Sequence, residues 1–411
     1  MSAPERPRFR SSLFVVLLTV FVDLVGFGVI VPLLPFYTDL FGGGPAVLGF
    51  LIASFFLMQF LTAPIFGRLS DRIGRRPVLL ATLGLATLSY VILAAATSLA
   101  VLFLARILSG IASGNLAVAQ AYVADRTLPE GRARGMGLIG AAFGVGFAVG
   151  PVIGGTLSPF GLSMPALAAA AIAAANLVLA IVFLPESISV KRPVATGLGW
   201  RRPGSMAEGF RRPTIRALLA TFFVVSFSFS AVPVAYPSLG IAYFGMGPRE
   251  LSLIFILIGA ITIAVGSALG RLARRLGEER LVALGAASMT AALAATPFIR
   301  DLAAYVALTG LMSFGVAITI PLVPALVSKR SSSAEQGSML GLTQSIGSLG
   351  RIPGPVIAGI LFQGVGVAAP FVLASLLMLL GFLLSVQVYR ESVRLAAAHA
   401  IRDAEGANGP T

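Results

Sequence analysis

The stretch LFVVLLTVFVDLVGFGVIVPLLPFYT, residues 13–38, decides the fold of this chain. Its one charged side chain is Asp23, and most of its other residues are aliphatic or aromatic. About 20 apolar residues let an α-helix cross a bilayer, so the stretch predicts a membrane-spanning helix. It is not a cleavable signal peptide, because the apolar run is too long, lacks an A-x-A exit and carries an acid at its centre.

Eleven further runs of spanning length follow this first one. They lie near residues 48–69, 78–97, 99–123, 135–158, 164–184, 214–240, 251–273, 281–299, 302–326, 337–362 and 368–389. Hydrophobic residues make up 57% of the 411 residues and charged residues 11%, whereas soluble domains carry roughly a quarter charged residues. With a mean hydropathy of +0.95, the chain is predicted to be an all-α membrane protein. Soluble, disordered and disulfide-scaffold proteins are excluded.

The 30 basic residues mark the cytoplasmic side of the membrane. With the N-terminus inside, 26 of them fall in cytoplasmic loops and tails, while Arg249 and Arg300 fall outside and Arg106 and Arg351 lie within spans. Cytoplasmic loops of membrane proteins carry such an excess of Lys and Arg. Both termini are therefore predicted to be cytoplasmic, and the net charge of +14 reflects topology rather than nucleic-acid binding.

The two halves of the chain repeat each other at offsets of 201, 203 and 204 residues. The matching segments are VPLLP at 31–35 with VPVAYP at 232–237, GRLSDRIGRR at 67–76 with GRLARRLGEE at 270–279, and GPVIGG at 150–155 with GPVIAG at 354–359. Parallel repeats of this kind occur in transporters whose substrate site lies between the halves. The predicted fold is thus twelve transmembrane helices in two pseudo-symmetric six-helix bundles around a central cavity.

This organisation divides the chain into five parts. They are a cytoplasmic N-terminal segment at 1–12, a first six-helix bundle at 13–184, a cytoplasmic central loop at 185–213, a second bundle at 214–390 and a cytoplasmic tail at 391–411. Within the central loop, the basic segment Trp200–Arg212 either lies on the anionic membrane surface or forms an unstructured linker.

The chain lacks the residues that several kinds of chemistry require. The chain has no Cys, and its single His, His399, lies in the polar tail, so thiolate and histidine catalysis and metal sites are not expected. No G-x-x-x-x-G-K-[ST] motif is present, so no nucleotide is expected as energy source. We expect neither an enzyme nor a cofactor or metal.

Two charged residues stand out inside the membrane. Asp23 lies about 15 Å into its span, near the midplane, and Arg106 lies about 10 Å below the outer face. A carboxylate at that depth costs roughly 2.5–3.5 kcal/mol to insert, so it must face protein or water. The two residues form either a structural ion pair or a functional site, and an ionisable residue inside the membrane favours function.

Helical phase assigns further polar residues. Arg106, Gly110, Ser113, Ala117 and Gln120 share one stripe of the fourth span, whereas Asn115 points the opposite way, which favours a packing hydrogen bond over a role as ligand. Candidates for the cavity wall are Phe27, Ser113, Gln120, Tyr236, Gln344 and Arg351. Arg351 either attracts an anionic group or binds backbone carbonyls, and the aromatic residues either line the cavity or face lipid.

Four segments carry a resemblance to a known family. They are GRLSDRIGRR at 67–76, RILSG at 106–110, GFAVGPVIGG at 146–155, and Asp23 with Pro32 and Pro35. With these segments the chain resembles the major facilitator superfamily, and within it the twelve-helix drug/proton antiporters of the tetracycline-efflux type. It departs from tetracycline exporters at Ser89 and Tyr90, about where those proteins carry an acidic residue in the third helix, which argues against tetracycline itself as substrate.

The resemblance implies roles for two motifs. Gly67, Asp71, Gly74, Arg75 and Arg76 are expected to form a conformational latch, with Asp71 paired to Arg75, as against a merely solvated turn. In the second copy Arg274 replaces the Asp, so that copy cannot form the same contact. The antiporter-motif residues are Gly146, Gly150, Pro151, Gly154 and Gly155. Their spacing alone indicates close packing on a partner helix, and the resemblance implies a gate against helix eight.

Together these features predict a secondary active transporter. The expected activity is proton-coupled antiport that exports a hydrophobic or amphiphilic small molecule by alternating access, as in drug efflux, with Asp23 and Arg106 coupling the proton. The alternative is a proton-coupled or facilitative carrier of a metabolite or sugar with the same fold. We expect a monomer in the cytoplasmic (inner) membrane, whose partners are the substrate and the lipid bilayer.

The topology can be tested with reporter fusions after Arg10 and after Arg394. Because an even number of spans separates the two sites, both reporters should be active on the cytoplasmic side. Reporters that land on opposite faces of the membrane would overturn the twelve-span prediction.

Overall fold

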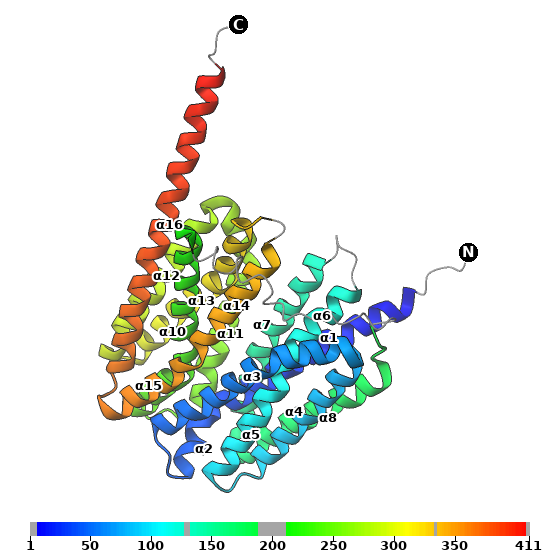
Figure 1. The fold of residues 1–411 in the computed structure, drawn as a ribbon. Coiled ribbons are helices and arrows are strands. Elements are labelled where there is room, and N and C mark those ends of the chain that lie inside the picture. The colour runs from blue at the N-terminus through cyan, green and yellow to red at the C-terminus, as the bar shows by residue number, and fades with distance from the viewer. Residues whose placement is uncertain (1–5, 127–131, 188–210, 333–334, 408–411) are drawn as a thin grey trace, which may run out of the picture. The chain divides into compact units, whose positions relative to one another are not determined.

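A computed structural model describes residues 6–126, 132–187, 211–332 and 335–407 of the chain. Within those ranges the regular structure is entirely helical, and twelve helices are long and apolar enough to cross a membrane. The predicted fold class and the predicted number of spans are confirmed (Figure 1).

The helices of the first sequence half run from α1 to α8. Their bounds are α1 Arg6–Ile30, α2 Leu34–Leu40, α3 Pro45–Ile73, α4 Arg75–Ala94, α5 Leu99–Ala112, α6 Leu116–Arg126, α7 Arg132–Leu157 and α8 Ser163–Phe183. Those of the second half are α10 Pro213–Phe244, α11 Pro248–Leu276, α12 Glu278–Ala295, α13 Leu302–Lys329, α14 Gln336–Arg351, α15 Pro353–Gly364 and α16 Ala369–Ala407.

Three spans consist of two helices each, and local sequence explains where they break. The 3₁₀ segment Val31–Leu33, which contains Pro32, joins α1 to α2. Proline has no backbone N–H to donate to the preceding turn, so the regular α-helix is interrupted there. The 3₁₀ segment Ser113–Asn115, named η2, joins α5 to α6 at a Ser-Gly-Asn sequence that favours helix poorly. Pro353 begins α15 directly after α14 ends.

The internal repeat is visible in the backbone. Gly74 ends α3 and Gly277 ends α11, with φ of 105° and 82°, and both precede a new helix directly. Only glycine adopts such a φ without strain. Matching turns therefore occur at matching places in the two halves, as the repeated motif predicts.

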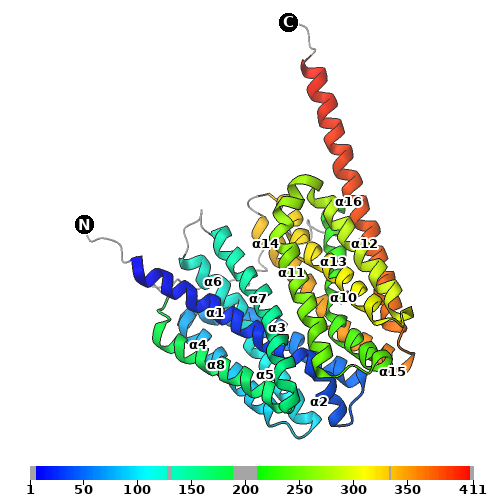
Figure 2. The ribbon, with the colours of Figure 1, turned by 180° about the vertical axis from the view of Figure 1, so that it is seen from behind.

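The helices group into two compact units that do not coincide with the two sequence halves. The first unit joins α1 through α8 to Ser230–Ile263 and Arg351–Pro370. The second unit contains the described residues of 211–229, Ala264–Gly350 and those from Phe371 onward. In the first unit, α1 packs against α7 and α8 (Figure 2).

Each unit has its own apolar core. In the first unit, valines of α1 such as Val25 and Val29 pack with Leu51 of α3, and Val234 and Ala358 from the second half join the same cluster. In the second unit, Leu218 of α10 packs with Val323 of α13 and Met339 of α14. The second half thus contributes residues to both cores.

The last helix runs past the predicted end of the second bundle. The predicted tail at 391–411 does not start a new element, because α16 continues without a break to Ala407 (red in Figure 1). The predicted central loop, 185–213, lies mostly outside the described residues, and so does Trp200–Arg212.

Close backbone contact joins α3 to α15 inside the first unit (Figure 1). A Cβ added at Gly49 would lie 2.3 Å from the Pro355 carbonyl oxygen, and one at Gly359 would lie 2.2 Å from that of Pro45. Gln363 strengthens the contact, because its Oε1 accepts a hydrogen bond from the Ala46 N–H at 3.1 Å. The two helices therefore meet reciprocally, each through a glycine.

Gly359→Ala should force α3 and α15 apart, because the added carbon cannot coexist with the Pro45 carbonyl. We expect a loss of about 1–3 kcal/mol of stability, typical of overpacking, and faster maleimide labelling of a cysteine introduced at Ala46. The chain has no other cysteine to react. Gly364→Ala is the control, since nothing lies within 4 Å of its added carbon; equal effects of the two substitutions would contradict the prediction.

Candidate functional site

Asp23 lies in the middle of α1, half-buried, and its partner is a neutral amide. Asn115 Nδ2 donates a hydrogen bond to Asp23 Oδ2 at 2.7 Å, and the Asn115 side chain is buried in η2. Asn115 makes a hydrogen bond within the protein, as expected, but its partner is the site residue Asp23, which the sequence did not indicate. Helical phase relative to Arg106 does not say which neighbouring helix a side chain meets, and here Asn115 meets α1.

Arg106 is buried in α5, with 1% of its surface exposed. Its guanidinium carbon lies 4.5 Å from the ring centroid of Phe55 and 5.8 Å from that of Phe27, which are cation–π distances. Among the described residues no ion pair joins it to Asp23, and its buried Nε and Nη2 have no hydrogen-bond partner. The two charges are neighbours without being paired.

Four phenylalanines from three helices form an aromatic cluster, and two of them, Phe27 and Phe55, contact Arg106. Phe27 of α1 lies 5.2 Å from Phe55, 6.3 Å from Phe56 and 6.3 Å from Phe147 of α7, measured between ring centroids. Phe55 is buried, whereas the other three rings are half-buried. The candidate residue Phe27 thus forms the centre of an aromatic cluster that is partly accessible.

Tyr90 of α4 belongs to the same site and was not predicted. It is buried, its hydroxyl hydrogen-bonds with Ser109, and both Asp23 and Arg106 lie within electrostatic reach of it. The sequence carried one signal, namely that Tyr90 stands about where tetracycline exporters have an acid. Without the helix contacts, that signal pointed to substrate choice and not to the charged pair.

The remaining cavity candidates occupy several elements. Gln120 of α6 and Gln344 of α14 are exposed, Ser113 and Arg351 are half-buried, and Tyr236 of α10 is buried. Of the predicted cavity residues, Ser113 and Phe27 lie beside the Asp23 site, on η2 and α1. A role in substrate binding remains a prediction for all of these residues.

The residues of the predicted latch form a charge cluster around the buried side chain of Arg75. Its guanidinium contacts Asp71 Oδ1 at 2.7 Å, Asp125 Oδ2 at 3.1 Å and Ser70 Oγ at 2.6 Å. The arginine side chain is 8% exposed, but that of Asp71 is 55% exposed. The expected Asp71–Arg75 pair is present, and Asp71 still presents its other oxygen to the surroundings. Gly67 faces open space.

Glu186 completes this cluster and was missed by the sequence analysis. Its carboxylate accepts hydrogen bonds from the backbone N–H groups of Arg75, Arg76 and Ser187 at 2.9, 3.2 and 2.9 Å. It therefore caps the first turn of α4, where negative charge is favoured by the helix dipole. The Arg76 guanidinium bonds the Ile181 carbonyl of α8 at 2.8 Å, so the turn is tied to α8 as well.

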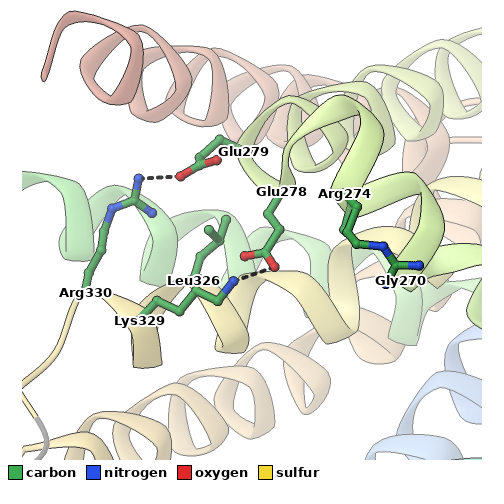
Figure 3. A pocket seen from close by; sticks show the side chains of 8 residues that line it. Gly270, Arg274, Glu278, Glu279, Leu326, Lys329 and Arg330 are labelled. Carbon is green, nitrogen blue, oxygen red and sulfur yellow. Dashed lines mark hydrogen bonds and ion pairs between the residues drawn. The ribbon is translucent and has the colours of Figure 1, made fainter. Parts of the chain in front are cut away.

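The second copy of the loop is held differently. Glu278 pairs with Lys329 at 2.7 Å and Glu279 with Arg330 at 3.0 Å. Both pairs lie beside a pocket of about 650 Å³ (Figure 3). Arg274 lines the same pocket from α11. The copy thus joins α12 to α13 by ion pairs instead of repeating the Asp–Arg pair, as the Arg274 replacement predicts.

The glycines of α7 contact two different helices. A Cβ at Gly146, Gly150 or Gly154 would lie 2.5–2.6 Å from a carbonyl oxygen of α1. The expectation that this stripe meets helix eight is therefore incorrect. Helix eight, α11, instead meets the adjacent faces of α7, where Gly155 packs on Ser252 and Ala148 on Gly259. Successive residues project about 100° apart, so Gly154 and Gly155 necessarily face different neighbours.

Pro151 belongs to the α1 face of α7. Its Cδ would lie 3.0 Å from a Cβ on Gly28, and α7 continues through the proline to Leu157.

Within the described residues, no group of three acidic or histidine side chains could hold a metal ion.

Twelve spanning helices, a turn repeated in the two halves and charged residues inside the spans are the features of a multi-pass membrane transporter. The sequence model of the Major Facilitator Superfamily matches this chain over residues 16–355 and 218–404. The chain belongs to this superfamily.

Its similarity extends to efflux proteins. The chain is 30% identical over 397 residues to "Multidrug resistance protein 2" of Bacillus subtilis (strain 168), covering 95% of this chain and 98% of that protein. It is 36% identical over 355 residues to "Tetracycline resistance protein, class C" of Escherichia coli, covering 85% and 89%. The crystal structure of the human organic anion transporter MFSD10 (TETRAN) matches with a TM-score of 0.69 and 29% identity, over 92% of this chain and 100% of that one.

Asp71→Asn should impair transport without lowering stability, whereas Glu186→Gln should lower stability. Asp71 is exposed, so its pairing contributes at most about 1 kcal/mol and the purified variant should melt near wild type while transport falls. Glu186→Gln weakens three backbone hydrogen bonds to a carboxylate, each worth about 1.5–3 kcal/mol, and should lower the melting temperature clearly. Thermal melts and substrate binding in detergent check this; loss of binding in Asp71→Asn would refute a purely conformational role.

Proposed function

We propose that this transporter is a proton-coupled antiporter that exports a hydrophobic or amphiphilic small molecule by alternating access. The observation that carries the proposal is the environment of Asp23. A carboxyl inside a span whose partner is a neutral amide can exist protonated or ionised, because the Asn115 N–H can donate to either form. An arginine partner would instead hold the ionised form.

The relatives support this type of substrate. Two of them are named for multidrug and tetracycline resistance, and the half-buried rings of Phe27, Phe56 and Phe147 offer an apolar surface next to the charged pair. Tetracycline itself is not our proposed substrate, because Ser89 and Tyr90 stand about where those exporters carry an acid.

Alternating access needs contacts that can close and open. The glycine contacts between α3 and α15 and between α7 and α11 lie near the ends that the predicted topology places outside. We propose that they close the outer side, and that Asp71 and its neighbours act at the cytoplasmic side. The protein would work as a monomer in the inner membrane with both termini cytoplasmic, without enzymatic activity or a cofactor other than protons.

A second candidate function is the transport of an organic anion. The unpartnered Nε and Nη2 of Arg106 lie on one edge of the guanidinium, the edge that binds a carboxylate through two parallel hydrogen bonds. The similar human protein MFSD10 is described as an organic anion transporter. Proteoliposome assays with cationic, neutral and anionic compounds of similar size separate the two candidates, and a sugar or metabolite panel tests the remaining alternative.

Asp23→Asn should abolish uphill transport driven by a pH gradient, because the amide cannot carry the proton. One pH unit can drive about tenfold accumulation for one proton per substrate, so the loss is easily measured in proteoliposomes with an imposed gradient. Downhill exchange of substrate should survive. Asp39→Asn is the control, since Asp39 is an exposed acid at the end of the same span. Wild-type accumulation by Asp23→Asn would place the coupling site elsewhere.

A further inference from the structure

Tyr90 fills a space that the backbone of α1 leaves for it. A Cβ added at Gly26 would lie 2.0 Å from the Tyr90 hydroxyl oxygen and 2.4 Å from its Cζ. The phenol therefore occupies the place where a side chain of residue 26 would begin. With 5% of its surface exposed, Tyr90 is fixed in this position by the surrounding helices.

That position is close to both membrane charges. Gly26 is three residues after Asp23 on α1, and Ser109 is three residues after Arg106 on α5. Residues three apart share a helix face, so a hydroxyl seated on Gly26 and bonded to Ser109 lies one turn from each charged residue. Asp23 and Arg106 are the ionisable groups that act on it, and α8, which also packs on α4, carries none.

The separation of these charges needs a physical cause. A carboxylate and a guanidinium attract strongly where water is excluded, and a bidentate pair is their most stable arrangement. Here Asp23 is held by Asn115, while the Nε–Nη2 edge of Arg106 has no hydrogen-bond partner in the part of the chain that the structure describes. The Asn115 amide holds one member of the pair, and the phenol of Tyr90, seated one turn from both, is well placed to keep them apart.

We propose that Tyr90 is a positioning residue of the coupling site, which keeps Asp23 and Arg106 from closing into an ion pair. The Asp23 carboxyl then stays free to gain and lose a proton, and Gly26 is required because any side chain there would displace the phenol. The purpose of this arrangement rests on the proposed proton coupling. The separation of the two charges can be tested without it.

A double-mutant cycle tests the separation directly. Melting temperatures of the purified protein are measured for Asp23→Asn, Arg106→Gln and the double variant, in wild type and in Tyr90→Ala. Substitutions of groups that do not interact have additive effects. In wild type, the changes in melting temperature caused by Asp23→Asn and by Arg106→Gln should therefore sum to the change in the double variant. In Tyr90→Ala they should fail to add by about 3 °C or more, because removing either member breaks the same new pair.

Two further backgrounds separate positioning from packing. Leu93→Ala removes another buried side chain one turn along α4, and there the two shifts should still add. Tyr90→Phe removes only the hydroxyl and should give a smaller departure from additivity than Tyr90→Ala; it also decides the question if Tyr90→Ala does not fold. Its matched control is Ser89→Ala, whose hydroxyl bonds its own helix at Ala86.

Transport gives the second readout. Accumulation driven by a pH gradient should fall at least about tenfold in Tyr90→Phe, and stay near wild type in Ser89→Ala, with substrate binding retained in both. Additive shifts in both Tyr90 backgrounds, or strong non-additivity already in wild type, would overturn the proposal. A wild-type protein that does not respond to a pH gradient would refute the proposed function, while the melting cycle would still judge the role of Tyr90.

Discussion

A carboxyl group at the middle of a membrane span must find its hydrogen-bond partner within the protein, because hydrocarbon supplies none. In this chain the partner is the amide of Asn115, and much of the local architecture follows from that bond. Asn115 ends the 3₁₀ segment η2, where the fourth span departs from a regular α-helix. The neighbouring cation must then be stabilised in some other way, and Arg106 is stacked on Phe55 and Phe27.

Close packing of backbones supplies the second organising feature. The repeated segments GPVIGG and GPVIAG place small residues on α7 and α15, where α1 and α3 approach within contact of the backbone. Without a hydrophobic force between helices in lipid, such small-residue contacts are a main source of association. Because α15 and the beginning of α11 use them against first-half helices, the compact units cut across the repeat.

Charged groups outside the spans follow a different rule. Around Arg75 and Glu186 they form a connected network that orders the turn between α3 and α4, whereas the matching turn of the second half relies on two ion pairs to α13. The two halves thus keep the same backbone turn, with glycine at positive φ, and differ in the side chains that hold it. This asymmetry is consistent with one copy having a latch role that the other lacks.

The sequence alone determined the twelve spans, the repeat, the family and the identity of Asp23 and Arg106 as the charges inside the membrane. These follow from transfer free energy and local motif, which are properties of each segment by itself. Tertiary structure decided the partners: Asn115 for Asp23, aromatic rings for Arg106, Glu186 for the turn at Gly74, and α1 for the glycine stripe of α7. A partner depends on which helices are adjacent, and adjacency is not encoded in the spacing of residues along a single segment.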